Sequence, residues 1–551
     1  MSITRIIGGT LKKTATDNID IRATEGNVDF IAAQNNNWHG EEDGIFHHDY
    51  EPLHTADSMS NSITITLNIF FDGTQNNKTN TIEGKNYKES NHEDDSYTND
   101  FSNVARGYDT VATNVPFQEK IYIEGIGTFD KESDDIFPDV ALGMGDRGVM
   151  AKVVKACVEA GKILSQGKYK GKKIDELKIN VFGFSRGAAA ARHFLHVANS
   201  PAIIFNTDRE NNITVNTPHS YQGMETAYFR FKVPYSPILD KHGYFAACLL
   251  KNEINPKTIK FNFTGLYDTV ASYGIYHGND VSDLDLNAIK NSHFVFQLSA
   301  DDEYRENFDL TDITSAGLNG LEYTLPGVHC DIGGAYNDLE DEVSVLYYKR
   351  ESIYNKVIHD TDTEIEKFRQ IVINEGWYKP NQITAGALRD SDLGTEVKGS
   401  VDDTETFYTV VGTRKGLRNT YDKIPLKKMF FFSGYFGVKY SNVKITDNHE
   451  INNPFLQGVY NQLINYMKAC SDLRNDYIKN KPTLAQEYLK ELRQISYLDY
   501  ISDKDLKTLR NEYLHWSVKA NKFGLETRES QAPSKEGALE QKYRKREIHH
   551  G

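Results

Sequence analysis

The sequence predicts an α/β fold in which a mostly parallel sheet is covered by helices on both faces. Strand-like and helix-like segments alternate from residue 63 to residue 299. A compact apolar strand, INVFGF at 179–184, runs directly into the helix-like segment SRGAAAARHFLHVA. Parallel strands need crossover connections, which are usually helices, so this alternation is typical of a parallel sheet. In such sheets ligands bind beyond the carboxyl ends of the strands, and the chemistry is expected there.

The individual elements follow in order along the chain. Short apolar runs bounded by polar residues or glycines predict strands, here at 63–71, 120–128, 176–184, 258–267 and 293–299. A Ser-, Asn- and Asp-rich insertion at 88–103 separates the first two. Residues 150–164 have helical periodicity, and a second helix is expected after Phe184.

The chain before this region predicts a short β-type segment over residues 1–60. NIDIRA at 18–23 and NVDFIA at 27–32 repeat at a nine-residue offset and alternate apolar and polar residues. The repeat fits an ordinary hairpin, or a strand pair that docks on the β-structure of another protein. Four histidines follow within 38–54, but their spacing matches no zinc template, so a solvated linker is expected and no metal site.

The chain after the sheet predicts a mainly helical region at 346–526 and a charged, disordered tail at 527–551. The catalytic domain is therefore expected at 61–345. The Phe-rich stretch 429–438 is too short to span a bilayer. It fits either a lipid-facing cap or a buried helix.

Composition excludes several classes of function. The 551 residues include 63 Lys and Arg against 78 Asp and Glu, a net charge of −15. This balance argues against binding to nucleic acid and gives no attraction to anionic lipid. The four cysteines contain no CxxC pair, which argues against a disulfide framework or a structural zinc site. The first residues lack the apolar region of a secretory signal, so we expect synthesis in the cytoplasm without a signal peptide.

The string GFSRG at 183–187 matches GxSxG, the nucleophile elbow, in the required context of strand, turn and helix. Ser185 is the candidate nucleophile. Gly183 and Gly187 leave room for the strained turn that lifts its hydroxyl clear of the backbone. The alternative is a glycine-bounded turn with a solvent-facing serine.

A serine nucleophile needs a base and an orienting acid, which follow it in the order acid, then histidine. Asp268 comes directly after the strand 258–267, and His329 lies in the glycine-rich loop LPGVHCDIGGAY. We expect His329 to exchange the Ser185 proton and Asp268 to fix the imidazole tautomer. Asp331 is a weaker candidate for the acid and is expected to shape its loop.

Two backbone N–H groups are needed to stabilise an oxyanion. One is expected from Arg186, the residue after the nucleophile. The second is expected from Gly73 or Thr74 in the turn FFDGT. Asp72 then fixes this turn, with a metal-binding role as the lesser alternative. No cofactor is expected.

Six ordered strings carry a resemblance to a known family: FFDGTQNN (70–77), EGIGT (124–128), GFSRGAAAAR (183–192), GLYDTVAS (265–272), ADDEYRENF (300–308) and LPGVHCDIGGAY (325–336). Over residues 63–340 the chain resembles the α/β-hydrolase domain of the type VI secretion phospholipase effectors, lipase family 1. The resemblance implies an α/β-hydrolase fold, a phospholipase of the A type, and a triad of Ser185, Asp268 and His329. Cys330 and Ala335 stand where the family usually has Ser and Gly.

The resemblance also implies partners and a destination. These are a phospholipid membrane as substrate, a secretion spike protein bound through the N-terminal segment, and a cognate immunity protein. Type VI injection into the envelope or periplasm of a target cell explains why no signal peptide is needed. Two alternatives stay open, namely an inactive adaptor associated with the spike and an esterase that acts on a non-phospholipid ester.

Overall fold

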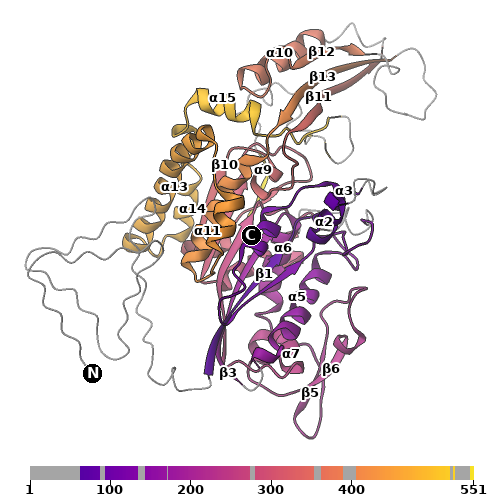
Figure 1. Cartoon of the computed structure of the whole chain (residues 1–551), viewed down its shortest axis with the longest axis vertical. Helices are drawn as coiled ribbons and strands as arrows, with labels where there is room; N and C mark the ends of the chain where they lie inside the picture. The colour runs from indigo at the N-terminus through magenta and orange to yellow at the C-terminus, as the bar shows by residue number, and fades with distance from the viewer. Residues whose placement is uncertain are drawn as a thin grey trace, which may run out of the picture. The chain divides into compact units, whose positions relative to one another are not determined.

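The computed structural model describes residues 62–86, 94–134, 143–169, 172–273, 280–352, 361–388, 405–520, 525, 527 and 546–551 (Figure 1). The predictions for the N-terminal repeat, its docking role and the histidines of 38–54 lie outside these residues. Residues 64–551 form one compact unit.

The core of this unit is a six-stranded sheet in the order β10–β8–β7–β3–β1–β2. Its strands are β1 (Ser62–Phe71), β2 (Gln118–Ile123), β3 (Lys173–Phe184), β7 (Thr258–Tyr267), β8 (Phe294–Ala300) and β10 (Gly320–Leu325). The pairs β1–β2, β3–β7, β7–β8 and β8–β10 are all parallel. The strands expected from the sequence are present, whereas β10 was not predicted.

Helices cover both faces of the sheet because successive side chains of a strand point to opposite sides. Phe70 of β1 contacts Tyr108 of α4 (Asn103–Thr110), while the next residue, Phe71, contacts Phe194 of α6 (Arg186–Val197). Two further helices, α5 (Val149–Leu164) and α7 (Leu239–Lys251), pack with α6 (Figure 1). This arrangement confirms the predicted α/β-hydrolase-like fold.

The C-terminal part is mostly helical, as expected. It contains α10 (Thr361–Asn374), α11 (Lys423–Tyr435), α12 (Asn442–Lys444), α13 (Pro454–Asn480), α14 (Ala485–Leu492) and α15 (Asp503–Glu512). Helix α13 packs on β10, where Tyr466 Oη accepts the Thr324 N–H at 3.0 Å. The remaining short helices are α2 (Lys78–Asn86), α3 (Asp95–Thr98), α8 (Asp280–Asp283) and α9 (His329–Gly333).

Two smaller three-stranded sheets were not foreseen. The strands β11 (Glu340–Ser352), β13 (Glu405–Leu417) and β12 (Ile383–Leu388) form an antiparallel sheet, at the top of Figure 1. A second antiparallel sheet contains β4 (Ile204–Thr207), β5 (Asn212–Asn216) and β6 (Arg230–Pro234). The expected boundary at 345/346 falls inside β11.

The Phe-rich stretch lies largely within α11, which packs on β7 and β8. Met429 and Phe430 are buried, and the Phe432 ring lies 4.3 Å from the Phe296 ring. These contacts agree with the buried-helix alternative. None of the described helices combines the length and apolar character needed to cross a bilayer.

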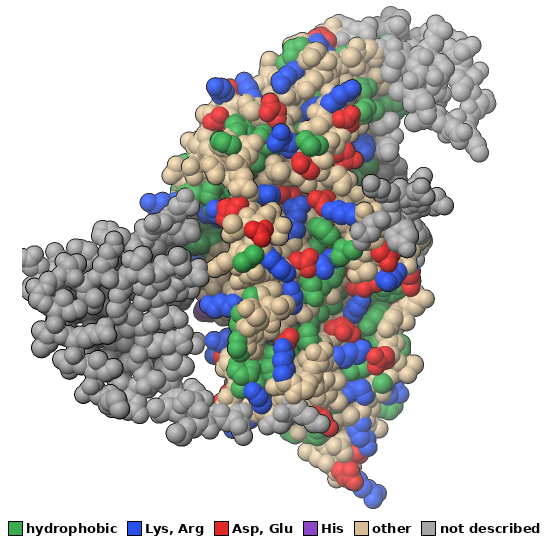
Figure 2. All heavy atoms as spheres, in the orientation of Figure 1, with side chains coloured by type: hydrophobic (Ala, Val, Ile, Leu, Met, Phe, Trp, Pro, Cys, Tyr) green, Lys and Arg blue, Asp and Glu red, His purple; other side chains and the backbone are tan. Residues whose placement is uncertain are grey.

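Acidic and basic side chains are mixed on the face of the molecule seen in Figure 2, where Lys and Arg lie interspersed with Asp and Glu. The expectation of a disordered tail is wrong for its last six residues. Residues 546–551 are placed, and β14 (Ile548–His549) pairs in parallel with β9 (Leu310–Thr311).

Candidate active site

Ser185 occupies the sharp turn between β3 and α6, with φ 57° and ψ −130°. This backbone conformation is strained for a residue with a side chain and is the geometry of a nucleophile elbow. The two flanking glycines are required sterically. A Cβ at Gly183 would lie 2.5 Å from the Ala188 Cα, and one at Gly187 would lie 2.2 Å from the Asp72 carbonyl oxygen. The elbow therefore packs tightly against the turn that follows β1.

Asp268 is the first residue after β7 and is completely buried. Its Oδ1 accepts the Ala300 N–H at 2.9 Å, and its Oδ2 accepts the His329 Nδ1–H at 2.5 Å. Burial opposes ionisation, but the positive charge of Arg546 and then the His329 hydrogen bond hold the pKa of Asp268 well below its usual range. The carboxylate is therefore ionised at neutral pH.

His329 begins α9, after β10, and its ring lies between two aromatic side chains. The Phe184 ring is 4.6 Å away and the Phe308 ring 5.1 Å away. Burial lowers the pKa of His329, while the hydrogen bond to Asp268 acts in the opposite direction. The neutral form, with Nδ1–H donated to Asp268, leaves Nε2 as the basic nitrogen.

The structure thus brings Asp268 and His329 into direct contact and places the His329 ring against the residue that precedes Ser185. Among the described residues, no hydrogen bond joins the Ser185 hydroxyl to His329. Such contacts are often long in unliganded enzymes and shorten when substrate binds.

The turn after β1 is held by the buried Asp72. Its Oδ1 accepts the Gly73 N–H at 2.8 Å and the Ser102 hydroxyl at 2.5 Å, and its Oδ2 accepts the Tyr122 hydroxyl at 2.6 Å. The Gly73 N–H is therefore engaged within the turn. The Thr74 N–H, for which the described residues supply no acceptor, is the better candidate for the oxyanion hole.

Thr74 also connects the turn to the nucleophile. The Arg186 Nε–H donates to the Thr74 hydroxyl at 2.8 Å, so the two candidate N–H donors belong to residues in contact. Arg186 is the first residue of α6, and the helix dipole favours negative charge at this end.

Asp72 provides a first prediction. Burial raises its pKa to about 6, which makes it a candidate for proton transfer as well as for turn formation. Asparagine can accept from Gly73 and Ser102 and donate to Tyr122, so Asp72→Asn is expected to keep kcat/KM within about tenfold of wild type. Asp72→Ala removes both acceptor oxygens, and with them all three hydrogen bonds, and is expected to cost about 2–4 kcal/mol of unfolding free energy. A loss of activity in Asp72→Asn as large as that in Asp72→Ala contradicts a purely structural role.

Sequence reasoning missed the side chains that hold the His329 loop. Glu303 is fully buried, accepts the His329 N–H at 3.2 Å and forms a two-pronged pair with Arg305, at 2.9 Å from both Nε and Nη2. Burial raises the pKa of Glu303, but Arg305 more than compensates and brings it to about 2. Both residues lie in the string ADDEYRENF, which signalled the family but gave no role to either side chain.

The weaker candidate for the acid, Asp331, has structural contacts. Asp331 Oδ2 accepts the Val328 N–H at 2.9 Å, and its Oδ1 pairs with His515 Nδ1 at 2.7 Å. It therefore shapes the His329 loop, as expected.

Comparisons with known proteins bear on the family and on the fold. Residues 66–355 match the family model described as T6SS, phospholipase effector Tle1-like, catalytic domain. The solved structure of the Tle1 effector bound to the VgrG spike from the type 6 secretion system shares the fold. It is 22% identical, with 84% of this chain and 86% of that chain covered and a TM-score of 0.51. An uncharacterized protein from Pseudomonas aeruginosa is 16% identical, with 78% of this chain and 52% of that chain covered and a TM-score of 0.32. No curated protein matches.

Proposed function

We propose that this chain, which belongs to the Tle1-like family of type VI secretion phospholipase effectors, hydrolyses acyl esters of glycerophospholipids through a triad of Ser185, His329 and Asp268. The observation that carries the proposal is the buried Asp268–His329 pair, whose ring lies against the strand that ends at the strained Ser185 elbow.

The mechanism follows from the roles that these groups can take. Ser185 Oγ attacks the ester carbonyl carbon while His329 Nε2 takes its proton, and Asp268 holds Nδ1–H and stabilises the imidazolium. The N–H groups of Arg186 and Thr74 donate to the oxyanion. His329 then gives the proton to the leaving alcohol, which is released as the lysophospholipid. Water, deprotonated by the same nitrogen, then attacks the carbonyl carbon of the acyl-Ser185 ester; the Ser185 Oγ–acyl bond breaks, His329 returns the proton to Oγ, and the fatty acid is freed.

Product analysis tests the substrate. Vesicles of a phospholipid with two distinguishable acyl chains are expected to yield one free fatty acid and the lysophospholipid, and the chain released gives the position cleaved.

A fluorophosphonate probe is expected to label the wild type but not Ser185→Ala. A folded wild type that the probe does not label favours the inactive adaptor, and labelling without phospholipid turnover favours a different ester.

Delivery forms a separate part of the proposal. We infer that residues 1–60 dock on a secretion spike, that injection carries the enzyme to the envelope or periplasm of a target cell, and that an immunity protein protects the producer. The fold shared with a spike-bound effector supports association with a spike, and the assignment to residues 1–60 rests on their short repeat. Deleting residues 1–60 is expected to abolish delivery and keep phospholipase activity. Loss of both contradicts a role restricted to delivery.

The pH dependence gives a second prediction. The active base is neutral His329, so activity falls as this group is protonated on the acid side. Because burial lowers the pKa of His329, the acid midpoint of kcat/KM is expected below the ordinary value of about 6.5. A pH profile with a soluble short-chain ester avoids effects of the lipid surface. An acid midpoint above this value contradicts the assignment of His329.

A further inference from the structure

The segment 546–551 is more than 200 residues from the strand that it joins. In β14 and its flanks, the carbonyl oxygens of Glu547 and His549 accept the N–H groups of Leu310 and Asp312, at 3.0 and 2.9 Å. Strand β9 in turn is tied to the catalytic loop, because the Thr311 N–H donates to the Thr269 carbonyl at 2.9 Å. The segment therefore joins the active-site loops through an ordered backbone ladder.

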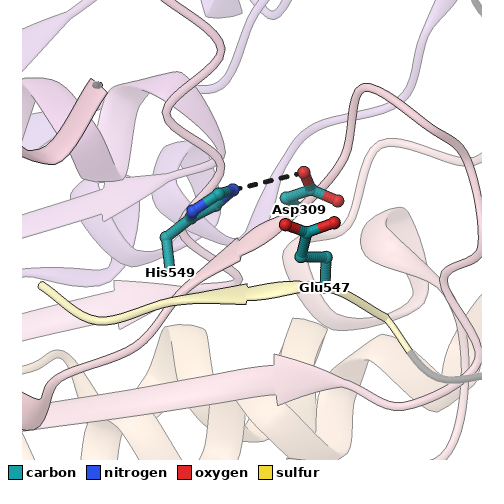
Figure 3. Close-up of side chains that lie close together, drawn as sticks. All are labelled: Asp309, Glu547 and His549. Carbon is teal, nitrogen blue, oxygen red and sulfur yellow. Dashed lines mark hydrogen bonds and ion pairs between the residues drawn. The ribbon is translucent and has the colours of Figure 1, made fainter. Parts of the chain in front are cut away.

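Side chains fix the segment at the same place. His549 Nε2 lies 3.3 Å from Asp309 Oδ2, with Glu547 beside them, as Figure 3 shows. His550 Nδ1 pairs with Asp312 Oδ2 at 2.7 Å. These contacts anchor both sides of β14 and set the position of the residue just before it, Arg546.

Arg546 enters the active site from this segment. Its Nη1 donates to Asp268 Oδ1 at 2.5 Å and its Nη2 to Asp268 Oδ2 at 3.0 Å, while Nε donates to the Phe308 carbonyl at 2.5 Å. The side chain is only 6% exposed. A guanidinium fork that grips both oxygens fixes the plane of a carboxylate, which a single charge does not.

Asp268 has few other means of orientation. Apart from Arg546, the described residues give its carboxylate only the Ala300 N–H and the His329 ring that it must orient. A wholly buried carboxylate also needs a counter-charge.

We propose that Arg546 is a positioning residue of the triad, which the segment 546–551 carries to Asp268, so that the catalytic acid is held in its productive orientation only while this segment is docked. This inference rests on the proposed function. Under this proposal, the segment 546–551 is part of the active site.

The alternative is a buried ion pair that stabilises the fold alone, and kinetics separates the two. Asp268, Glu303, Arg305 and Arg546 are the charged groups around His329 in the described structure. Removing the Arg546 charge leaves the negative charge of Asp268 less compensated. The acid midpoint of kcat/KM is then expected to rise by about 1 pH unit. This shift reports the loss of the charge, whereas the orienting role of the guanidinium fork is tested by kcat in Arg546→Lys, which keeps the charge.

The experiment uses the full chain, a soluble short-chain ester and the variants Arg546→Ala and Arg546→Lys. Arg546→Ala is expected to lower kcat by about 10²-fold with little change in KM, to shift the acid midpoint upward, and to recover activity when millimolar guanidinium is added. Arg546→Lys keeps the charge but loses the fork, so it is expected to show reduced kcat with an unshifted midpoint.

The matched control is Arg106→Ala, which breaks another mostly buried arginine pair, with Asp422 at 2.5 Å. It is expected to lose stability with no shift of the acid midpoint and no response to guanidinium.

The inference is overturned if folded Arg546→Ala has the wild-type kcat and the wild-type acid midpoint of kcat/KM. If that variant does not fold, wild-type kcat in Arg546→Lys overturns it. Ser185→Ala, assayed alongside, keeps the outcomes distinct, because residual activity there contradicts the proposed function instead.

Discussion

Replacing Ser185 with alanine is expected to lower kcat/KM toward a phospholipid by roughly 10⁴–10⁶-fold while the fold stays intact. The substitution removes only the Oγ atom from a residue that is 5% exposed. The strained backbone is retained, since it is imposed by the contacts of Gly183 and Gly187 and by the Ser185 N–H bond to the Tyr267 carbonyl at 3.1 Å. The loss corresponds to about 5–8 kcal/mol of transition-state stabilisation.

His329→Ala is expected to lose a similar amount, because nucleophile and base act as a unit. The double variant tests this directly. If Ser185 and His329 serve one reaction, the two losses do not add, and the double variant is no slower than the worse single one. Circular dichroism and the unfolding midpoint provide the control for folding. Near-normal lipase activity in either single variant contradicts the proposed triad.

The sequence was sufficient for the features that local pattern controls. Strand, glycine turn and alanine-rich helix identified the Ser185 elbow because each of these signals lies within about fifteen residues of the others. The order of the loops then assigned Asp268 and His329, and the structure joins them by a hydrogen bond. The catalytic role of the three residues stays a prediction.

Features that depend on long-range contacts gave no such signal. Arg546 lies in a charged stretch whose composition indicates disorder, and nothing local shows that it pairs with a carboxylate 278 residues earlier. The sequence also could not decide whether Gly73 or Thr74 supplies the second oxyanion N–H. That depends on the direction in which the Asp72 carboxylate points. The buried Glu303 was visible only as part of a family string.

Asp268→Asn is expected to combine a large loss of activity with a loss of stability. An asparagine oxygen can accept from Ala300 and Arg546, but its NH₂ group then faces His329 Nδ1. The imidazole must move its proton to Nε2 to avoid a clash of two donors, and Nε2 can no longer accept the Ser185 proton. Loss of the productive tautomer in this way is expected to lower kcat by about 10⁴-fold.

The same substitution leaves the Arg546 guanidinium buried without its counter-charge, at an expected cost of about 3–5 kcal/mol of unfolding free energy. The double variant Asp268→Asn, Arg546→Met separates the two effects, because it removes the orphaned charge and restores no acid. Its unfolding midpoint is expected to recover toward wild type, whereas kcat stays low. If activity recovers together with stability, Asp268 serves the fold and not the orientation of His329. Recovery of stability alone establishes that one carboxylate both orients His329 and neutralises the arginine that holds it.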